Sequence, residues 1–425
     1  MRETTRDVEP VVKMIEASGH ARESLEPRAV ADAPLRVLGV DPELGFAGGE
    51  TQVLGLTLGL LHAGHRAELA CDPRGRLYER ARREGIECHP LPIRNALDFA
   101  AGLRLRNLLS RAPYDIVHFH TSRAHSMAPF ARGHARALVV TRRMDFRPNR
   151  LFAPYLYNRA VDAVAAISRK VADALGEAGV TRDHLRIIPS GVDCEHFHPA
   201  SPSEREAARN RLGIARDVFL VGAVGMLEER KGHRYLLEAI AMANRERGAE
   251  SRIKCAIAGD GTMRAELADL AQQSGIANDT LFLGMIGDVR QLLDALDLFV
   301  FPSLQEGLGV ALLEAMACGL PIIASRAGGV VDIVQDHKLD HQQDHMEDHQ
   351  QDHQNGILLP PRESASIASA IATLESDAAR RSQLGSAARA SMVENFSMDA
   401  MSQKTIDLYR ACLVGRAPNP QEVRY

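Results

Sequence analysis

Short apolar runs alternate with longer stretches of helical periodicity along most of the chain. Residues 35–40, 115–120 and 137–141 are rich in Val, Leu, Ile and Phe, which is typical of buried strands. Helical stretches separate these runs, so the order of elements predicts a parallel sheet built from strand–helix–strand units. Residues 1–34 are charged and lack an apolar period. We therefore expect the fold to begin at Leu35, after a flexible extension.

The same rhythm restarts after residues 187–193, which a polar, Pro-containing segment follows. Further strands are predicted at 219–224, 255–258, 281–283 and 298–301. This pattern predicts an α/β protein with two Rossmann-like, doubly wound domains, at 35–192 and 193–396, and with a last segment at 397–425. Ligands of such sheets bind at the carboxyl ends of the strands, so we expect a cleft between the two domains.

One segment departs from this pattern. Between residues 335 and 354 the dipeptide Asp-His recurs every four residues. In a helix each such step turns about 400°, so the five histidines cannot share one face. Neighbouring pairs at i and i+4 suit zinc or nickel, but a solvated, tandemly expanded insertion is the favoured interpretation.

Composition indicates a protein made and kept in the cytosol. The chain has 425 residues, 45% of them hydrophobic, and a net charge of −4. No apolar run is long enough to span a membrane, and the N-terminus lacks the apolar core of a signal peptide. The six cysteines include no C-x-x-C pair, which favours reduced thiols over a disulfide framework or a zinc site.

Charge is distributed unevenly along the chain. Between Arg66 and Lys170 there are 20 Lys and Arg against 9 Asp and Glu, so this stretch favours an anionic partner. The alternative is a solvated Arg-rich surface. Nucleic acid is not expected, because Trp is absent, aromatic residues make up 4% of the chain and no recognition motif accompanies the charge.

The most informative stretch for chemistry is residues 302–321. A strand exit and a Gly-containing loop lead into a helix near Gly309, and the first amides of such a helix can hold an anion. Glu306 lies in the loop and Glu314 lies on the helix, eight residues later. The alternative is an unrelated pair of loop and surface carboxylates.

The N-terminal half contributes further candidates at strand ends. His118 and His120 share one face of a predicted strand; they are either ligand-binding or satisfied groups at the sheet edge. Arg142 and Arg143 follow the next strand, and such side chains bind anions bidentately. With Arg123 they are the acceptor-binding candidates, although a structural ion-pair cluster is an equal alternative.

Residues 101–111 form a basic amphipathic helix. Helices of this type can lie on anionic membrane surfaces. The alternative, which we favour from the sequence, is that the helix packs its Leu face on the sheet.

Several motifs carry a resemblance to a known family. Glu306 and Glu314 precede the stretch AMACGLP, and AGG follows at 327–329. Earlier motifs are FAGG at 46–49, IIPSGVD at 187–193, AGDG at 258–261 and FLG at 282–284. Together they resemble the motifs of family 4 glycosyltransferases, which have the GT-B fold, and the resemblance spans residues 35–409.

The resemblance implies roles for individual residues. Glu306 would face the donor sugar, Glu314 would hydrogen-bond the ribose hydroxyls, and Lys231 would neutralise the donor phosphates. His120, the nearer of the two histidines to the strand end, would contact the sugar. The catalytic candidates are therefore Glu306, His120 and Lys231. The other donor-binding candidates are Gly48, Gly49, Arg230, Gly284, Met285, Ile286, Leu308, Gly309, Val310 and Glu314. The last helix, near 398–414, would cross back onto the first domain.

The sequence departs from the family pattern at the phosphate loop. Met226 stands where many members have Arg, and Arg230 is a candidate replacement. Ser190 replaces a common Asn, which carries little mechanistic weight. No Asp-x-Asp triplet occurs, so we expect no metal and no other cofactor, with the nucleotide sugar as substrate.

The resemblance implies transfer of a sugar from a nucleotide donor to a hydroxyl group, with retention at the anomeric carbon. The charge of the N-terminal half suggests an anionic, lipid-linked acceptor of the cell envelope, such as a lipopolysaccharide core, and peripheral contact with the inner face of the cytoplasmic membrane. Two alternatives remain. One is a GT-B sugar-nucleotide epimerase, and the other is a non-catalytic nucleotide-binding module.

Overall fold

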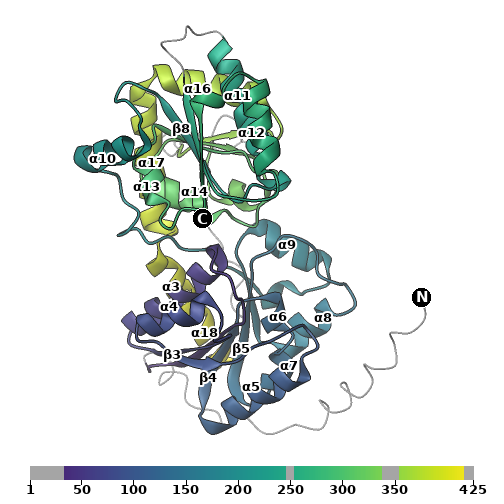
Figure 1. The fold of residues 1–425 in the computed structure, drawn as a ribbon. Coiled ribbons are helices and arrows are strands. Elements are labelled where there is room, and N and C mark those ends of the chain that lie inside the picture. Colours follow the sequence, from purple (N-terminus) through teal and green to yellow (C-terminus); the bar gives the residue numbers. More distant parts are fainter. Residues whose placement is uncertain (1–32, 246–252, 337–353, 416–425) are drawn as a thin grey trace, which may run out of the picture. The chain divides into compact units, whose positions relative to one another are not determined.

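The computed structural model describes residues 33–245, 253–336 and 354–415. The chain divides into two compact units, which are described separately (Figure 1). Unit 1 comprises Met1–Ile188 and Met401–Tyr425, and unit 2 comprises Pro189–Ala400. The predicted N-terminal extension and most of the Asp-His repeat lie outside the described residues. Within the described ranges, no helix combines the length and the apolar character needed to cross a bilayer.

Unit 1 contains a seven-stranded parallel sheet in the order β3-β2-β1-β4-β5-β6-β7. Its strands are β1 (Arg36–Asp41), β2 (Arg66–Cys71), β3 (Glu87–Pro90), β4 (Tyr114–Phe119), β5 (Ala135–Arg142), β6 (Ala163–Ala166) and β7 (Leu185–Ile187). The strand order extends both ways from β1, with β2 and β3 on one side and β4 to β7 on the other. Right-handed crossovers therefore place the connecting helices on both faces of the sheet. The predicted strands near 35–40, 115–120 and 137–141 are confirmed by β1, β4 and β5.

Two helical layers cover this sheet (Figure 1). One contains α3 (Gly48–His62), α4 (Arg76–Arg83) and the unit 1 part of α18 (Met398–Val414). The other contains α5 (Phe99–Arg111), α6 (Ser122–His125), α7 (Ala128–Ala131), α8 (Ala153–Tyr155), η1 (Leu156–Ala160) and α9 (Arg169–Glu177). A single 3-10 turn, η2 (Arg182–His184), precedes β7. Helix α18 packs closely on α3, because a Cβ at Gly59 would lie 2.2 Å from the Ser402 hydroxyl.

Unit 2 repeats the design with a six-stranded parallel sheet in the order β10-β9-β8-β11-β12-β13. Its strands are β8 (Leu220–Val224), β9 (Lys254–Ala258), β10 (Thr280–Gly284), β11 (Leu298–Phe301), β12 (Ile322–Ser325) and β13 (Ile357–Leu359). Every side chain of β11 and β12 is buried, as expected for strands covered on both faces. The predicted strands of this half are confirmed.

The helices of unit 2 begin with α10 (Pro202–Leu212), which Ser201 caps through its hydroxyl. The others are α11 (His233–Arg245), α12 (Arg264–Gln273), α13 (Arg290–Leu293), α14 (Val310–Ala317), α16 (Ser364–Ser376) and α17 (Ala378–Asn395), with short turns η3 (Glu229–Lys231), η4 (Ala277–Asp279) and η5 (Gly328–Asp332). Beside the repeat, Asp336 accepts hydrogen bonds from the backbone amide of Leu358 and the side chain of Gln354, both at 2.9 Å. These bonds fasten the described ends of the insertion to β13.

A buried ionic network joins the amino ends of four strands in unit 1. The Glu68 carboxylate of β2 accepts hydrogen bonds from Tyr114 at 2.6 Å, from His89 at 2.7 Å and from Arg36 at 2.8 Å. Burial raises the pKa of Glu68, but the three donors outweigh burial and lower it to about 2. The same contact raises the pKa of His89.

This network makes stability depend on pH with a defined sign. Because the pKa of Glu68 is depressed in the fold, its contribution is complete above its ordinary value of 4.5 and is lost as the pH falls towards about 2. Between about pH 5.5 and pH 3 we expect wild type to lose about 2 kcal/mol of unfolding free energy through this group. Urea unfolding at both values measures the loss.

Glu68→Gln should remove most of that dependence. The control is Glu79→Gln, because Glu79 forms an exposed helix-surface pair with Arg83, which is worth little. An unchanged pH dependence in Glu68→Gln would contradict the role assigned to the network.

Candidate functional site

The carboxyl ends of the unit 2 strands bring two predicted catalytic residues together. Lys231 lies in η3 after β8, and Glu306 lies in the loop after β11. The Lys231 ammonium forms an ion pair and hydrogen bond with Glu306 Oε1, and the Ser303 hydroxyl donates to the same oxygen at 2.9 Å. Both charged side chains are largely buried, with 14% and 8% of their surface exposed. A buried pair of this kind is held in one arrangement by its hydrogen bonds.

Close backbone packing explains why these loops meet. Gly232 has φ +66°, and a Cβ there would lie 2.0 Å from the carbonyl oxygen of Pro302. Gly328 has φ +57°, and a Cβ there would lie 1.7 Å from the carbonyl oxygen of Glu306. That carbonyl accepts a hydrogen bond from Gly329 N at 3.1 Å. Only glycine fits both positions, so the loops after β8, β11 and β12 fix the backbone of Glu306.

Helix α14 begins beside Glu306. Gly309 precedes the helix with φ +107° and provides no side-chain cap, Leu308 is buried, and Val310 is the first helical residue. The first amides of α14 are therefore open to an acceptor from outside the helix. They carry the positive end of the helix dipole.

Glu314 lies on the second turn of α14 and is half-buried. Burial, with a smaller contribution from Asp288, raises its pKa to about 8. Its carboxyl group has no hydrogen-bond partner among the described residues, and this isolation is what a ligand that donates hydrogen bonds would relieve.

The remaining donor-site candidates of unit 2 differ in their surroundings. Met226 is 43% exposed. Arg230 pairs with Glu228 at 2.7 Å on the surface, so its proposed replacement of the missing arginine competes with this contact and stays a prediction. Gly284 ends β10 with φ +66°, Met285 after it is exposed, and Ile286 is half-buried.

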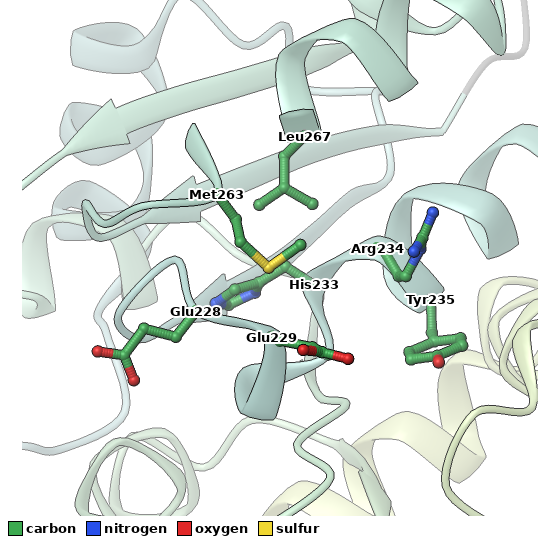
Figure 2. A pocket seen from close by; sticks show the side chains of 8 residues that line it. Glu228, Glu229, His233, Arg234, Tyr235, Met263 and Leu267 are labelled. Carbon is green, nitrogen blue, oxygen red and sulfur yellow. The ribbon is translucent and has the colours of Figure 1, made fainter. Parts of the chain in front are cut away.

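Sequence reasoning missed His233, which lines a small pocket of about 30 Å³ behind the same loop (Figure 2). Its ring is buried, and neither ring nitrogen has a hydrogen-bond partner within the described residues. Burial, then Lys231, lowers its pKa to about 4. A pocket of this volume has room for water.

In unit 1 the two histidines have different surroundings. His118 uses both ring nitrogens, at 2.7 Å from the Tyr409 hydroxyl and at 2.7 Å from the Thr141 hydroxyl. His120 follows β4 directly and is buried, and its Nδ1 has no partner in the described ranges. Burial holds the pKa of both rings well below the ordinary value, so both are neutral. His118 is therefore structural, whereas His120 has a buried ring nitrogen without a partner in the described ranges.

Two of the three acceptor-binding candidates are occupied within unit 1. Arg142 donates to Phe146 O at 2.9 Å and to the Ser122 hydroxyl at 3.2 Å. Arg123 forms a bidentate pair with Glu43. The ion-pair alternative therefore describes Arg123, whereas Arg142 is held by neutral hydrogen-bond acceptors, and the contacts of both residues compete with an acceptor.

The third candidate, Arg143, lies beside a group that the sequence did not single out. Helix α3 begins at Gly48. A Cβ at Gly49 would lie 3.9 Å from the Cδ atom of Arg143. Asp41 and Glu50 act electrostatically on it, and its Nε has no hydrogen-bond partner in the described chain. Burial lowers the pKa of Arg143 to about 10 and raises that of Asp41 to about 7. The sequence signal that could have pointed to this group is Asp41, a carboxylate at the end of the first strand.

Among the described residues, one group of His, Cys, Asp and Glu side chains is spaced to hold a metal ion, namely Glu68, Glu87 and His89. It lies at the amino ends of β2 and β3, in the network above, where Arg36 and Tyr114 already occupy Glu68. The candidate site residues lie instead at the carboxyl ends of the strands, near Lys231 in unit 2 and near Arg143 in unit 1.

Two family models match the chain. The model described as "Glycosyl transferases group 1" matches residues 204–391, and the model described as "Glycosyltransferase Family 4" matches residues 46–196. Together they account for about four-fifths of the sequence.

Similar proteins agree with these models. EpsF of Bacillus subtilis is 40% identical over 152 residues, which cover 35% of this chain and 38% of EpsF. Alpha-maltose-1-phosphate synthase of Mycobacterium tuberculosis is 28% identical over 70% of this chain and 73% of the synthase. The alignment with EpsF thus spans well under two thirds of the length of EpsF. Among solved structures, HepE of Anabaena, in complex with UDP, has a TM-score of 0.74 at 23% identity, with 88% of this chain and 99% of HepE covered. This likeness shows the GT-B fold.

The Lys231–Glu306 pair generates a stability prediction. Lys231→Met leaves a buried carboxylate without its cation, so we expect a loss of about 3 kcal/mol in unfolding free energy. In the double variant Lys231→Met/Glu306→Gln no charge is left alone, and part of the loss should be recovered. Chemical denaturation of wild type, both single variants and the double variant gives the coupling energy.

The matched control is Arg230→Met. It removes a neighbouring cation whose side chain is 47% exposed, and we expect a change within about 1 kcal/mol. Equal losses in Lys231→Met and Arg230→Met, or a coupling energy near zero, would show that the pair is not held as described.

Proposed function

Because the chain belongs to the family 4 glycosyltransferases, we propose that it transfers a sugar from a nucleotide-sugar donor to a hydroxyl group of an acceptor. The observation that carries the proposal is the Lys231–Glu306 pair, which lies at the carboxyl edge of the unit 2 sheet beside the open amides of α14. Cations and oriented amides at a strand edge suit a nucleoside diphosphate.

The chemistry follows from where charge develops. When the bond between the anomeric carbon and the phosphate oxygen breaks, the leaving diphosphate gains negative charge. Lys231 and the α14 amides would stabilise that charge in the transition state without reorganising. The contact with Glu306 orients the Lys231 ammonium and leaves its other protons free to donate. Transfer without a metal ion is part of this proposal, since a fixed cation takes that role.

Glu314 is proposed to bind the ribose hydroxyls, since its carboxyl group has no partner of its own. We propose that the donor carries uridine diphosphate. The support is HepE, whose structure has been solved with UDP-glucose. In unit 1, His120 would contact the sugar through its available nitrogen. Retention of the anomeric configuration is proposed by family resemblance, and no nucleophile is assigned.

The proposed acceptor is an anionic, lipid-linked glycan of the cell envelope, reached from the cytosol. The support is the excess of arginine in unit 1 and the partly unsatisfied guanidinium of Arg143. One observation favours a second candidate, a non-catalytic nucleotide-binding module: the exposed Met226 in place of a phosphate-facing arginine. Such a module would bind nucleotide and turn over no donor.

Nucleotide binding is tested by thermal unfolding with saturating UDP, GDP, ADP and CMP, each with and without EDTA. A ligand at 100 times its dissociation constant adds about 2.7 kcal/mol, so we expect UDP to raise the melting temperature by several degrees and EDTA to leave that rise unchanged. Glu314→Ala should abolish the rise. Glu375→Ala, on α16, is the control and should keep it. A rise that EDTA removes would overturn metal independence, and no rise with any nucleotide would overturn the donor site.

Glu314 also predicts how binding varies with pH. An ionised carboxylate accepts hydrogen bonds more strongly than a neutral carboxyl group, and the pKa of Glu314 in the free protein is about 8. UDP affinity should therefore rise by up to about tenfold between pH 7 and pH 9. Titration calorimetry of wild type and Glu314→Gln checks this, because the Gln variant should show a flat profile.

A further inference from the structure

Large apolar side chains are exposed in two short segments of unit 1. Of the fifteen exposed large hydrophobic residues among those described, eight lie in residues 97–103 and 144–155, including every exposed aromatic ring. We define the apolar surface as Leu97, Phe99, Leu103, Phe146, Leu151 and Phe152. Leu97 and Leu151 are 76% and 83% exposed. Scattered exposed leucines are ordinary, but such a concentration marks an interaction site.

The two segments belong to one helical layer of unit 1, formed by α5 to α9 (Figure 1). Phe99 of α5 packs edge-on against Phe130 of α7, with ring centroids 5.9 Å apart. Helix α7 packs in turn against η1, which continues directly from α8. Residues 97–103 and 144–155 therefore flank the same layer.

Hydrogen bonds hold these apolar residues outward. Asp98 caps α5 by accepting from Ala101 N at 3.0 Å, so Phe99 and Leu103 occupy successive turns of a fixed helix. Arg142 binds the carbonyl oxygen of Phe146 and lies over its ring at 4.7 Å. The side chain of Asn149 accepts from Leu151 N at 2.9 Å. Their exposure is thus built into the local structure.

The charge around the apolar surface is predominantly positive. From Arg94 to Lys170 the sequence has 14 Lys and Arg, four Asp and no Glu. The exposed arginines include Arg94, Arg106, Arg111, Arg150 and Arg159, and none of these five is in an ion pair within the described ranges. Arginine binds phosphate bidentately, and its stem lies easily along apolar surface.

We propose that the apolar surface docks unit 1 on an anionic lipid bilayer, with the leucine and phenylalanine side chains in the interface and the surrounding arginines on lipid phosphates. A protein partner would have to match the five unpaired exposed arginines with acidic groups around an apolar centre, whereas an anionic bilayer matches the whole arrangement. The inference deepens the proposed function, on which it rests for the lipid-linked acceptor.

The first experiment uses the absence of Trp from the chain. Leu151→Trp places the only tryptophan of the chain in the apolar surface, and Val393→Trp places it at a residue of α17 that is 49% exposed. Full-length protein is mixed with vesicles of phosphatidylethanolamine and phosphatidylglycerol, three to one, or of phosphatidylcholine alone. We expect a blue shift and quenching by brominated lipid for the Leu151→Trp protein with anionic vesicles only, and neither for the Val393→Trp protein.

The second experiment measures vesicle co-sedimentation. Phe99→Ser/Leu103→Ser and Arg106→Gln/Arg111→Gln should each lower the partition coefficient at least about tenfold, and about 0.5 M salt should weaken wild-type binding. Met242→Ser/Val393→Ser removes comparable exposed apolar groups from unit 2 and should bind as wild type does. Circular dichroism and the melting temperature confirm that each variant is folded.

Neither readout needs a donor, an acceptor or turnover, so failure of the proposed transferase activity leaves this test intact. Absence of wild-type binding to anionic vesicles would overturn the inference, and so would binding that ignores both surface variants. A Trp at position 151 that is shielded by self-association or by a protein, and not by lipid, would show instead that this surface is a protein interface.

Discussion

The ion pair between Lys231 and Glu306 constrains the whole carboxyl edge of unit 2. Two charges taken out of water are costly unless their geometry and their other hydrogen bonds are good, and here Ser303 supplies one further bond to Glu306. The pair joins loops that follow two adjacent strands, β8 and β11. Glycines at 232 and 328 allow the backbones to approach closely enough for it to form. Because the loops are fixed, the first turn of α14 is fixed too, and a cation and open amides lie at the same strand ends.

The carboxyl edge of the unit 1 sheet carries a different set of ionisable groups. There, neutral histidines replace the ion pair, and Asp41 and Glu50 face a single arginine, Arg143. Burial shifts the pKa of the histidines, of Asp41 and of Arg143 towards their uncharged forms. The Glu50 carboxylate caps α3 by accepting a hydrogen bond from Ala47 N. An edge of this kind offers hydrogen-bonding groups more than net charge, which suits hydroxyl-rich ligands. The strong positive charge of unit 1 lies elsewhere, on the outer surface of its helices.

The sequence allowed the order of strands and helices to be predicted because buried parallel strands appear as continuous apolar runs, and β1, β4, β8 and β11 all do. It did not predict pairings over long distances. Lys231 and Glu306 are 75 residues apart, and nothing local shows that they meet. His118 and Tyr409 are separated by 291 residues, so alternation along the strand could not separate the structural histidine from the available one. Asp41 was missed because a carboxylate at a strand end is unremarkable until its burial is known.

The arginines of unit 1 have two different roles. Arg142 and Arg123 act inside the unit, where they bind the Phe146 carbonyl and the Glu43 carboxylate and so shape the loops after β5 and β1. Four exposed arginines of α5 and of the 150–159 segment, Arg106, Arg111, Arg150 and Arg159, form no ion pair within the described residues, whereas the neighbouring Arg147 pairs with Glu177. An external anion would reduce the mutual repulsion among these unpaired arginines. Arg142 links the two groups physically, since the guanidinium that is held at the strand edge also holds Phe146 in its exposed position. A single side chain therefore contacts both the strand edge and the apolar surface.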